Sequence, residues 1–256
     1  MAVADFSLEG KVAIVTGGSR GIGRSIALGL AEHGADVAIA ARKPEALEET
    51  LADLKSTGRR AIAVPTNVRD LDALQNLVDT TKRELGRVDI LVNNAATNPF
   101  FGPIENIDER AWDAIMNTNV KSLFFISKMA RAAMLEHGDG GAIINVSSVG
   151  GFQASDVIGA YSVSKSAAIM VTQVCAKSWG KDGIRVNCIA PGLIKTDFSK
   201  ALWDNPEILK GSTAGAALGR IADPDEMARV VLFLASDLST YVTGSLIVAD
   251  GGYLIV

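Results

Sequence analysis

Short apolar runs rich in β-branched residues recur along the whole chain, and most are followed by a segment with helical spacing. Runs of this kind, bounded by glycine, proline or charged residues, are typical of strands that are buried on both faces. They predict strands at residues 11–16, 36–41, 61–65, 88–92, 142–146, 184–189 and 245–249.

Between these runs, apolar residues return every three to four positions, as on one face of a helix. Ile22, Ile26 and Leu30 keep this spacing up to Gly34, a residue suited to ending a helix. Further helices are predicted at residues 45–56, opened by Pro44, at 71–85, at 108–133, and from the Tyr161 region to about Trp179.

Strands that alternate with helices predict an α/β protein: a single doubly wound Rossmann-type domain with a seven-stranded parallel sheet and helices on both faces. No repeat and no linker rich in proline, serine or charge divides residues 1–256, so one domain is expected. Residues 195–217 alone break the alternation. Segments of that length without a pattern usually line or cover a binding site, so this one is predicted to be a substrate lid.

The composition is that of a folded globular protein, and it argues against two classes of partner. With 256 residues, 48% hydrophobic and 21% charged, the chain can bury a full core. A net charge of −4 argues against nucleic-acid binding, and the lack of a long apolar run argues against a membrane span. The first ten residues lack a secretory pattern. Cys175 and Cys188 are interpreted as buried, inert thiols, which fits a reducing, cytoplasmic location.

Neither of the two histidines marks a metal site. His33 ends a predicted helix, where it can interact with the helix dipole, and His137 lies in the glycine-rich segment 136–141. Neither has a second ligand residue at a useful spacing, so no metal is expected.

Three glycines follow the first predicted strand and open the first predicted helix. Gly17, Gly21 and Gly23 would let the backbone turn tightly and approach a phosphate, and the amino end of the helix would offer it free N–H groups. Their spacing differs from the commoner G-x-G-x-x-G of dinucleotide-binding folds. A dinucleotide site is the predicted role, and a glycine turn with only a packing role is the alternative.

The end of the second predicted strand indicates which dinucleotide is bound. NAD sites commonly carry an acidic residue there to hold the ribose 2′-hydroxyl. Here the strand ends in two alanines followed by Arg42 and Lys43, Asp36 lies at its other end, and Arg20 sits in the glycine loop. Guanidinium groups pair well with phosphate oxygens, so the pattern favours NADP(H) over NAD(H). The alternative is that Arg42 and Lys43 only form the solvated start of a helix.

Tyr161 and Lys165 stand four residues apart in a predicted helix and therefore share one face. A nearby ammonium group favours the phenolate and lowers the pKa of a tyrosine, which can then give or take a proton near neutral pH. The same spacing occurs by chance on many solvated helices. The pair therefore indicates a proton-transfer site only in combination with the motifs around it.

Together these motifs resemble the short-chain dehydrogenase/reductase family. The resemblance spans residues 8–252 and rests on the order and spacing of residues 16–23 (TGGSRGIG), 93–95 (NNA), Asn119, Ser148, Tyr161 with Lys165, and 191–192 (PG). Residues 98–102, 190–199 and 202–203 are similar to an NADP-dependent retinol dehydrogenase/carbonyl reductase branch, typified by a vertebrate peroxisomal enzyme.

The resemblance implies catalytic roles for four residues. Ser148, thirteen residues before Tyr161, would hold the substrate carbonyl oxygen, with Ser147 as a structural neighbour. Tyr161 would donate a proton to that oxygen as hydride arrives from NADPH, and Lys165 would lower the tyrosine pKa and bind the nicotinamide ribose. Asn119 would hold a water linking Lys165 to solvent. Without the family, Asn119 would be interpreted as a satisfied amide inside a helix.

The resemblance also implies a set of cofactor contacts. Asn94 and Ala95 would lie along the adenosine ribose, and Pro191, Gly192, Ile194 and Thr196 would border the nicotinamide. Asn67 and Val68 would lie beside the adenine, at a position where the family often has an acidic residue before the valine. The full predicted set is Gly17, Ser19, Arg20, Gly21, Ile22, Gly23, Arg42, Asn67, Val68, Asn94, Ala95, Tyr161, Lys165, Pro191, Gly192, Ile194 and Thr196.

Three segments are expected to surround the reacting carbonyl: residues 98–101, 150–158 and 193–217. They offer apolar walls with few polar anchors, which suits hydrophobic or aromatic ketones and aldehydes. The alternative is that most of their aromatic residues belong to the core. The predicted substrate contacts are Phe100, Ser148, Phe152, Gln153, Ile158, Leu193, Phe198 and Trp203, with Gln153 as the polar anchor.

The predicted activity is the reversible, NADPH-dependent reduction of apolar or aromatic ketones, α-dicarbonyls or aldehydes. A 3-oxoacyl-thioester (acyl-carrier-protein) reductase would use the same site, and a non-catalytic NADP-binding sensor or scaffold is the alternative outside enzymes. The apolar segment 251–256 is expected to pack into a partner subunit of a homotetramer. It lacks the Ser-Lys-Leu-like address of the peroxisomal enzyme, so a cytoplasmic location is expected.

Overall fold

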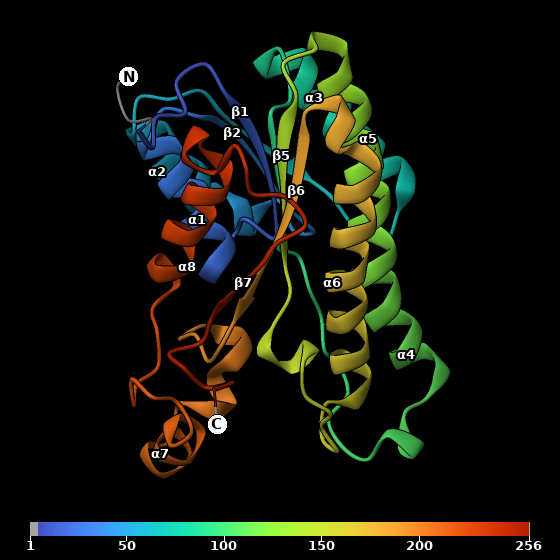
Figure 1. The fold of residues 1–256 in the computed structure, drawn as a ribbon, viewed down its shortest axis with the longest axis vertical. Coiled ribbons are helices and arrows are strands. Elements are labelled where there is room, and N and C mark those ends of the chain that lie inside the picture. The colour runs from blue at the N-terminus through green and yellow to red at the C-terminus, as the bar shows by residue number, and fades with distance from the viewer. Residues whose placement is uncertain (1–4, 256) are drawn as a thin grey trace.

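The computed structural model describes residues 5–255 and contains a seven-stranded sheet of order β3-β2-β1-β4-β5-β6-β7 (Figure 1). Every neighbouring pair of strands is parallel, which confirms the predicted fold class. The strands are β1 (Val12–Thr16), β2 (Asp36–Ala41), β3 (Ala61–Pro65), β4 (Ile90–Asn93), β5 (Gly141–Val146), β6 (Ile184–Pro191) and β7 (Leu246–Ala249).

Helices cover both faces of the sheet and bury one apolar core on each side. One core joins the strands to α1, α2 and α8, and the other joins them to α3, α5 and α6 (Figure 1). The helices are α1 (Gly21–Glu32), α2 (Glu45–Ser56), α3 (Leu71–Leu85), α4 (Glu109–Met116), α5 (Ser122–His137), α6 (Gly159–Trp179), α7 (Pro206–Thr213) and α8 (Pro224–Ala235).

The predicted bounds of α2, β3 and α3 agree with the structure. The long helical region predicted over residues 108–133 is present, but a π-helical turn at Asn117–Lys121 divides it into α4 and α5, and α5 continues to His137. Asn119 lies in this turn, and its side chain forms two hydrogen bonds with the backbone of Thr97. His137 is the last residue of α5 and not part of a loop, and its Nε2 lies 3.0 Å from the Val88 carbonyl oxygen.

Helix α8 was absent from the sequence-based prediction although its amino end carries clear signals. Asp223 and Glu226 form a capping box, and Pro224 occupies the first turn. Met227, Val231 and Leu234 then bury one face against the sheet. Residues 195–217 likewise contain more regular structure than predicted, namely a 3₁₀ turn η5 (Asp197–Leu202) and helix α7.

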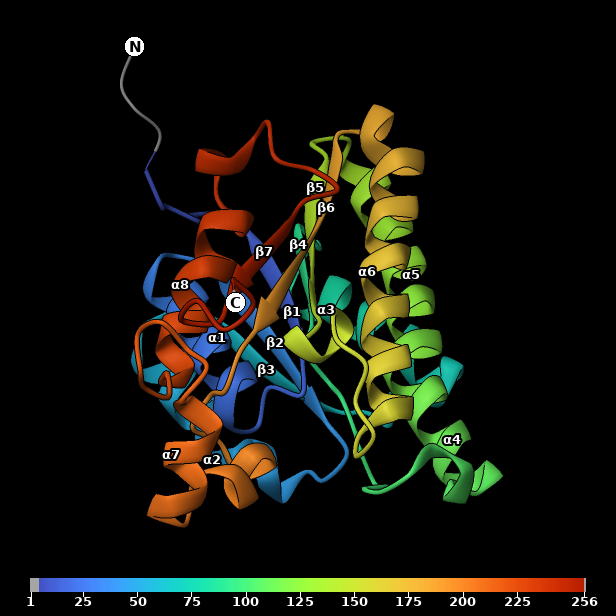
Figure 2. The same cartoon turned by 60° about the horizontal axis from the view of Figure 1, so that its bottom comes forward.

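The strand order reverses between β1 and β4, and a binding site is expected at this point of the sheet. In open parallel sheets, ligands bind where neighbouring connections run to opposite faces, beyond the carboxyl ends of the strands. Figure 2 turns this end of the molecule toward the viewer, with α7 on the side of α1 and α2, and α4 on the side of α5 and α6. Among residues 5–255, no helix is both long and apolar enough to cross a membrane.

Candidate active site

The glycine loop between β1 and α1 is packed too closely for a side chain at Gly17 or at Gly23. Gly17 and Gly21 have φ values of 67° and 54°, in the left-handed region that glycine favours. A Cβ atom on Gly23 would lie 2.2 Å from the Gly17 carbonyl oxygen, and one on Gly17 would lie 2.8 Å from Nδ2 of Asn94. The loop is thus a backbone-lined cradle at the amino end of a helix, which fits the phosphates of a dinucleotide.

Asn94, which is predicted to lie along the adenosine ribose, supports this cradle through hydrogen bonds to the loop. Its Nδ2 donates to the carbonyl oxygens of Thr16 (3.0 Å) and Gly17 (3.2 Å). The backbone N–H groups of Asn94 and Ala95 both donate to the Thr16 hydroxyl, at 3.0 and 3.1 Å. The Asn94 side chain is therefore engaged in shaping the loop.

Gly23→Ala should damage the cradle while Gly29→Ala, in the same helix, should not. The Gly23 methyl group would displace the Gly17 carbonyl, whereas a Cβ on Gly29 would lie 3.5 Å from the Cβ of Ala228, an ordinary contact. We expect Gly23→Ala to cost about 1–3 kcal/mol of unfolding free energy and to abolish dinucleotide binding. Gly29→Ala should be neutral or stabilising by up to about 1 kcal/mol. Equal thermal-unfolding midpoints and equal binding in the two variants would contradict this account.

Ser148, Tyr161 and Lys165 come together at the carboxyl end of β5. Ser148 Oγ accepts a hydrogen bond from the Gly150 N–H at 3.1 Å, which leaves its own proton free to be donated. Tyr161 lies in the first turn of α6, and Lys165 Nζ lies 5.4 Å from the centre of its ring. Lys165 is buried and donates to the Val146 carbonyl oxygen at 2.9 Å. The Ser147 hydroxyl turns away and donates to the Lys165 carbonyl oxygen.

Burial, and not Lys165, governs the pKa of Tyr161. Although part of the side chain remains accessible, desolvation raises the pKa of Tyr161 to about 12, while the Ser148 hydroxyl acts in the opposite direction. Desolvation also lowers the pKa of Lys165 to about 8. For the chain alone the pKa of Tyr161 is thus raised by desolvation and not lowered as predicted, and the nearby ammonium of Lys165 is engaged by the Val146 carbonyl oxygen.

Asn119 is fully engaged by neighbouring groups of the protein. Its Oδ1 accepts from the Thr97 N–H at 2.9 Å, and its Nδ2 donates to the Thr97 carbonyl oxygen and the Ser164 hydroxyl, both at 3.0 Å. The side chain therefore fastens the segment after β4 to α6. A water held by this residue would use its main chain or the second lone pair of Oδ1.

The basic residues predicted at the adenosine end differ in their environments. Arg20 is exposed and pairs with Asp197 of the 195–217 segment at 3.1 Å. Arg42 is exposed and forms no ion pair with any residue of 5–255. Val68 is buried, and Asn67 Oδ1 accepts weakly from the Arg69 N–H at 3.3 Å. Asp197 was not a predicted site residue, and its pairing across the chain could not be read from spacing.

The segment after β6 reaches back to the glycine loop. Pro191 ends β6, and Ile194 is buried and forms an isolated bridge with Ala222. The Cγ2 atom of Thr196 lies 3.2 Å from the point where a Cβ on Gly21 would stand. The predicted nicotinamide border and phosphate cradle are therefore adjacent in space.

The predicted substrate residues are only partly brought together. Phe198 packs by Tyr161, with 6.2 Å between ring centres. Trp203 instead supports the 195–217 segment from within, because its Nε1 donates to the Thr196 carbonyl oxygen at 3.0 Å. Phe152 and Gln153 are exposed on the 150–158 segment, and Phe100, Ile158 and Leu193 are partly buried.

A buried polar network below the site was missed by the sequence analysis. Asn93 Nδ2 donates to Asn145 Oδ1 (2.8 Å) and to the Ser127 hydroxyl (2.9 Å). Asn145 Nδ2 in turn donates to the Thr172 hydroxyl at 2.8 Å. The network ties β4, β5, α5 and α6 together. An asparagine within two otherwise apolar strand patterns was the signal available in the sequence.

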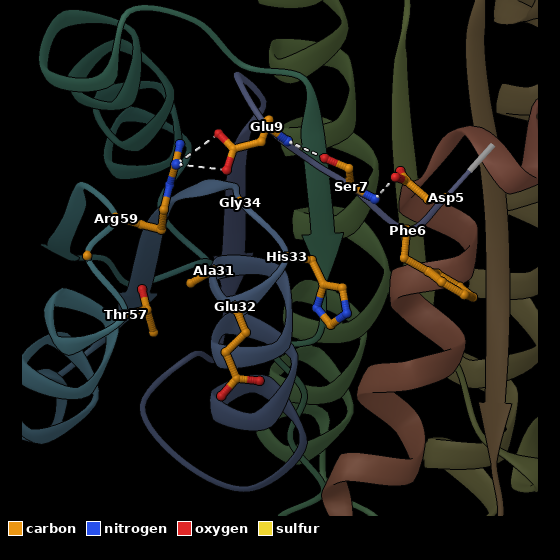
Figure 3. A pocket seen from close by; sticks show the side chains of 11 residues that line it. Asp5, Phe6, Ser7, Glu9, Ala31, Glu32, His33, Gly34, Thr57 and Arg59 are labelled. Carbon is orange, nitrogen blue, oxygen red and sulfur yellow. Dashed lines mark hydrogen bonds and ion pairs between the residues drawn. The ribbon is translucent and has the colours of Figure 1, made fainter. Parts of the chain in front are cut away.

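One hollow lies away from these groups. It measures about 650 Å³ and sits where Glu9, Gly34 and Arg59 precede the first three strands (Figure 3). Arg59 is already paired with Glu9 there, at 2.9 Å. None of the predicted site residues lines this hollow. The glycine cradle, the hydroxyls of Ser148 and Tyr161 and the buried Lys165 all lie at the carboxyl ends of the strands. This grouping favours that end of the sheet as the reactive site.

Comparison with known proteins agrees with this geometry. A family model described as enoyl-(acyl carrier protein) reductase matches residues 17–254. Bovine dehydrogenase/reductase SDR family member 4 is 38% identical over 247 residues, covering 96% of this chain and 88% of the relative. The chain belongs to the short-chain dehydrogenase/reductase family.

Two solved structures share nearly the whole fold. Carveol dehydrogenase of Mycobacterium avium, in complex with NAD, has a TM-score of 0.93 and 31% identity, covering 97% of this chain and 99% of the other. A protein described as an NAD(P)-dependent gluconate 5-dehydrogenase of Beutenbergia cavernae, with NADP bound at low occupancy, has a TM-score of 0.92 and 35% identity, covering 98% and 99%. This family member is therefore an oxidoreductase of the NAD(P)-binding type.

Proposed function

We propose that this chain is an NADPH-dependent reductase of apolar or aromatic ketones, α-dicarbonyls or aldehydes, of the retinol dehydrogenase/carbonyl reductase branch. The observation that carries the proposal is the placement of Phe198 beside Tyr161, with ring centres 6.2 Å apart. An aromatic side chain next to the proton donor offers an apolar surface to the group attached to the reacting carbonyl. Phe100, Ile158 and Leu193 would extend that surface.

In the proposed reaction the bound nicotinamide supplies the hydride, and the protein supplies the proton. The Ser148 hydroxyl, with the Gly150 N–H on its oxygen, donates to the carbonyl oxygen and stabilises its developing negative charge. Tyr161 Oη transfers its proton to the same oxygen. Because burial raises the pKa of Tyr161 to about 12, the phenol stays protonated near neutral pH. Lys165 then holds the nicotinamide ribose, and Asn119 keeps the segment after β4 against α6.

NADP(H) is proposed as the cofactor because β2 ends in two alanines followed by Arg42 and Lys43, with no acidic residue at this point, and because Arg42 is exposed. Arg20 would serve as the second phosphate ligand once it leaves Asp197. The glycine loop with Ser19, Gly21 and Ile22 would hold the diphosphate, Asn67 and Val68 would border the adenine, and residues 191–196 the nicotinamide. Because the carveol dehydrogenase structure holds NAD, the choice of cofactor is tested by comparing the KM values for NADPH and NADH.

The pH profiles of the two directions should differ. Oxidation of an alcohol needs the Tyr161 phenolate, and the raised pKa of the tyrosine makes that form scarce near neutral pH. We expect kcat for oxidation to rise with pH between about pH 7 and 9, by up to tenfold per unit, while kcat for reduction does not rise. Steady-state rates in both directions on one ketone–alcohol pair measure this. A flat oxidation profile would argue against Tyr161 as the base.

Two other functions are tested by the choice of substrate. A 3-oxoacyl-thioester reductase would use the same serine and tyrosine, and the gluconate 5-dehydrogenase relative points to polyols. We expect kcat/KM for aryl ketones to exceed that for acetoacetyl thioesters and for keto-sugar acids. A strong preference for the thioester would overturn the proposed substrate class. Cofactor binding without turnover of any carbonyl would favour the third alternative, a sensor or scaffold.

We propose residues 195–217 as a substrate lid, a homotetramer as the assembly and a cytoplasmic location. For the assembly, α5 and α6 expose a shared apolar face with Phe124 (36% exposed), Met170 (58%) and Val174 (54%) around a hollow of about 360 Å³. Such a face is unfavourable in water and suits a subunit contact. The two buried free thiols fit a reducing location. Light scattering should give four chains per particle, and Met170→Glu should lower that number.

A further inference from the structure

The 195–217 segment has little packing of its own to hold it in place. No residue of η5 or α7 is buried, and Phe198, Leu202 and Ile208 are each about half exposed. A segment with few buried contacts takes its position from the points where it is attached. Its attachments therefore decide where Phe198 stands relative to Tyr161.

The first attachment is at the start of the segment. The Lys195 N–H donates to the Ala222 carbonyl oxygen at 2.9 Å, and the Ala222 N–H donates to the Leu193 carbonyl oxygen at 3.1 Å. This pairing extends from β6 and fixes residues 193–195 beside the sheet. It leaves the other end of the segment to be held elsewhere.

The second attachment is a hook formed by residues 250–254. The Asp250 carboxylate accepts from the backbone N–H groups of Gly252 and Leu254, both at 2.8 Å, and so closes the hook on itself. Gly251 and Gly252 have φ values of 66° and 84°, which favour glycine. The Leu218 N–H donates to the Gly251 carbonyl oxygen at 2.9 Å and fastens the lid to it.

Side-chain contacts between the hook and the lid are close. A Cβ on Gly215 would lie 3.1 Å from Cε2 and 3.3 Å from Cδ2 of Tyr253, so the tyrosine ring occupies the space beside this glycine. A Cβ on Gly252 would lie 2.7 Å from the Ala217 Cβ. The segment 251–256 is predicted to pack into a partner subunit, and two of its residues, Gly252 and Tyr253, also lie against Ala217 and Gly215 of the same chain.

The hook also touches the predicted nicotinamide border. A Cβ on Gly192 would lie 2.8 Å from the Asp250 Cα, so the turn after β6 and the hook are in direct contact. The lid, the hook and the turn after β6 thus form one connected unit. A shift of the Tyr253 ring would move the 213–218 segment and, through it, the lid that carries Phe198.

We propose that Tyr253 is a positioning residue that seats the lid over the carbonyl site by filling the space beside Gly215. It touches neither cofactor nor substrate, and it acts through the lid. This inference rests on the proposed function, since it assumes that residues 195–217 cover the carbonyl substrate. The ring, and not the hydroxyl, does the seating, because the described contacts of Tyr253 with Gly215 are made by ring carbons.

The test compares Tyr253→Ala, Tyr253→Phe and Gly215→Ala, with Tyr241→Ala as the control because Tyr241 is fully exposed. Trypsin reports the position of the lid independently of activity, since Lys200 and Lys210 lie within it. We expect Tyr253→Ala and Gly215→Ala to accelerate cleavage at these lysines, and to raise KM for an aryl ketone, by about fivefold or more. NADPH Kd and kcat should change by less than about twofold.

Tyr253→Phe and Tyr241→Ala should behave as the parent in each measurement. The proposal is overturned if Tyr253→Ala and Gly215→Ala keep the parental cleavage rate and KM, or if Tyr253→Phe is as defective as Tyr253→Ala. A loss of NADPH binding in both Tyr253→Ala and Gly215→Ala would also overturn it, because the contact would then serve the whole fold. If no carbonyl is turned over by the parent, the proposed function fails, and the cleavage rates still decide whether Tyr253 seats the lid.

Discussion

Tyr161→Phe should lower kcat for carbonyl reduction by about 10²–10⁴-fold while leaving the Kd for NADPH nearly unchanged. The substitution removes only the phenolic oxygen, which in the proposed mechanism carries the transferred proton. Lys165 keeps its hydrogen bond to the Val146 carbonyl oxygen, and the ring still packs against Phe198, so the cofactor side of the site should persist. Stopped-flow rates and fluorescence titration with NADPH measure the two quantities.

Tyr241→Phe provides the matched control, because Tyr241 is fully exposed and distant in sequence from every predicted site residue. It should retain parental rates. If Tyr161→Phe also retains the parental kcat, the assignment of the proton donor is wrong. If it loses NADPH binding as well as turnover, the phenolic oxygen also holds the cofactor, and the loss of turnover then does not assign the proton donor.

Arg42→Asp should reverse the preference for cofactor. In the proposed site the guanidinium pairs with the ribose 2′-phosphate, and an aspartate would repel the phosphate and accept from a 2′-hydroxyl. We expect kcat/KM for NADPH to fall by about ten- to a hundredfold, with a gain for NADH. Arg42 is free to make this contact because it is exposed and unpaired within the described residues, whereas Arg20 must first leave Asp197.

Lys43→Asp controls for the change in net charge. It alters the charge by the same two units at the neighbouring position, where a contact with the phosphate is not proposed. Because salt screens the charge, its effect on kcat/KM for NADPH should be about threefold or less. A parental enzyme with a lower KM for NADH than for NADPH, together with an Arg42→Asp variant that uses NADPH unchanged, would refute the cofactor assignment.

Much of the fold could be predicted because parallel strands buried on both faces leave a simple pattern. The runs at β1, β2 and β3 are continuous and apolar, and α3 shows an apolar stripe with a capping residue, Asp70, before it. The π-helical turn at Asn117–Lys121 could not be predicted from periodicity. Asn119 in this turn is hydrogen-bonded to Thr97 and Ser164, residues brought close only by the tertiary fold.

The sequence indicated which residues form the site, but it did not indicate how the environment shifts the pKa of Tyr161. The order of the glycine loop, Ser148, Tyr161 and Lys165 indicated which residues meet, and the structure places these last three together at the end of β5. The direction of the tyrosine pKa shift was predicted wrongly, since helical spacing says nothing about desolvation or about the Val146 carbonyl that engages Lys165. The Arg20–Asp197 pair and the contact of Tyr253 with Gly215 join residues far apart in sequence.

The most direct test of the central claim is to follow the hydride itself. The enzyme would be incubated with NADPH deuterated at the transferred position and with an aryl ketone, and the product analysed by mass spectrometry and NMR. The account predicts one deuterium on the carbinol carbon, with incorporation lost in Tyr161→Phe. Because the matching family model is described as an enoyl reductase, an α,β-unsaturated thioester would be offered in parallel. Deuterium at the β-carbon of that thioester, with none in the alcohol, would contradict a carbonyl reductase.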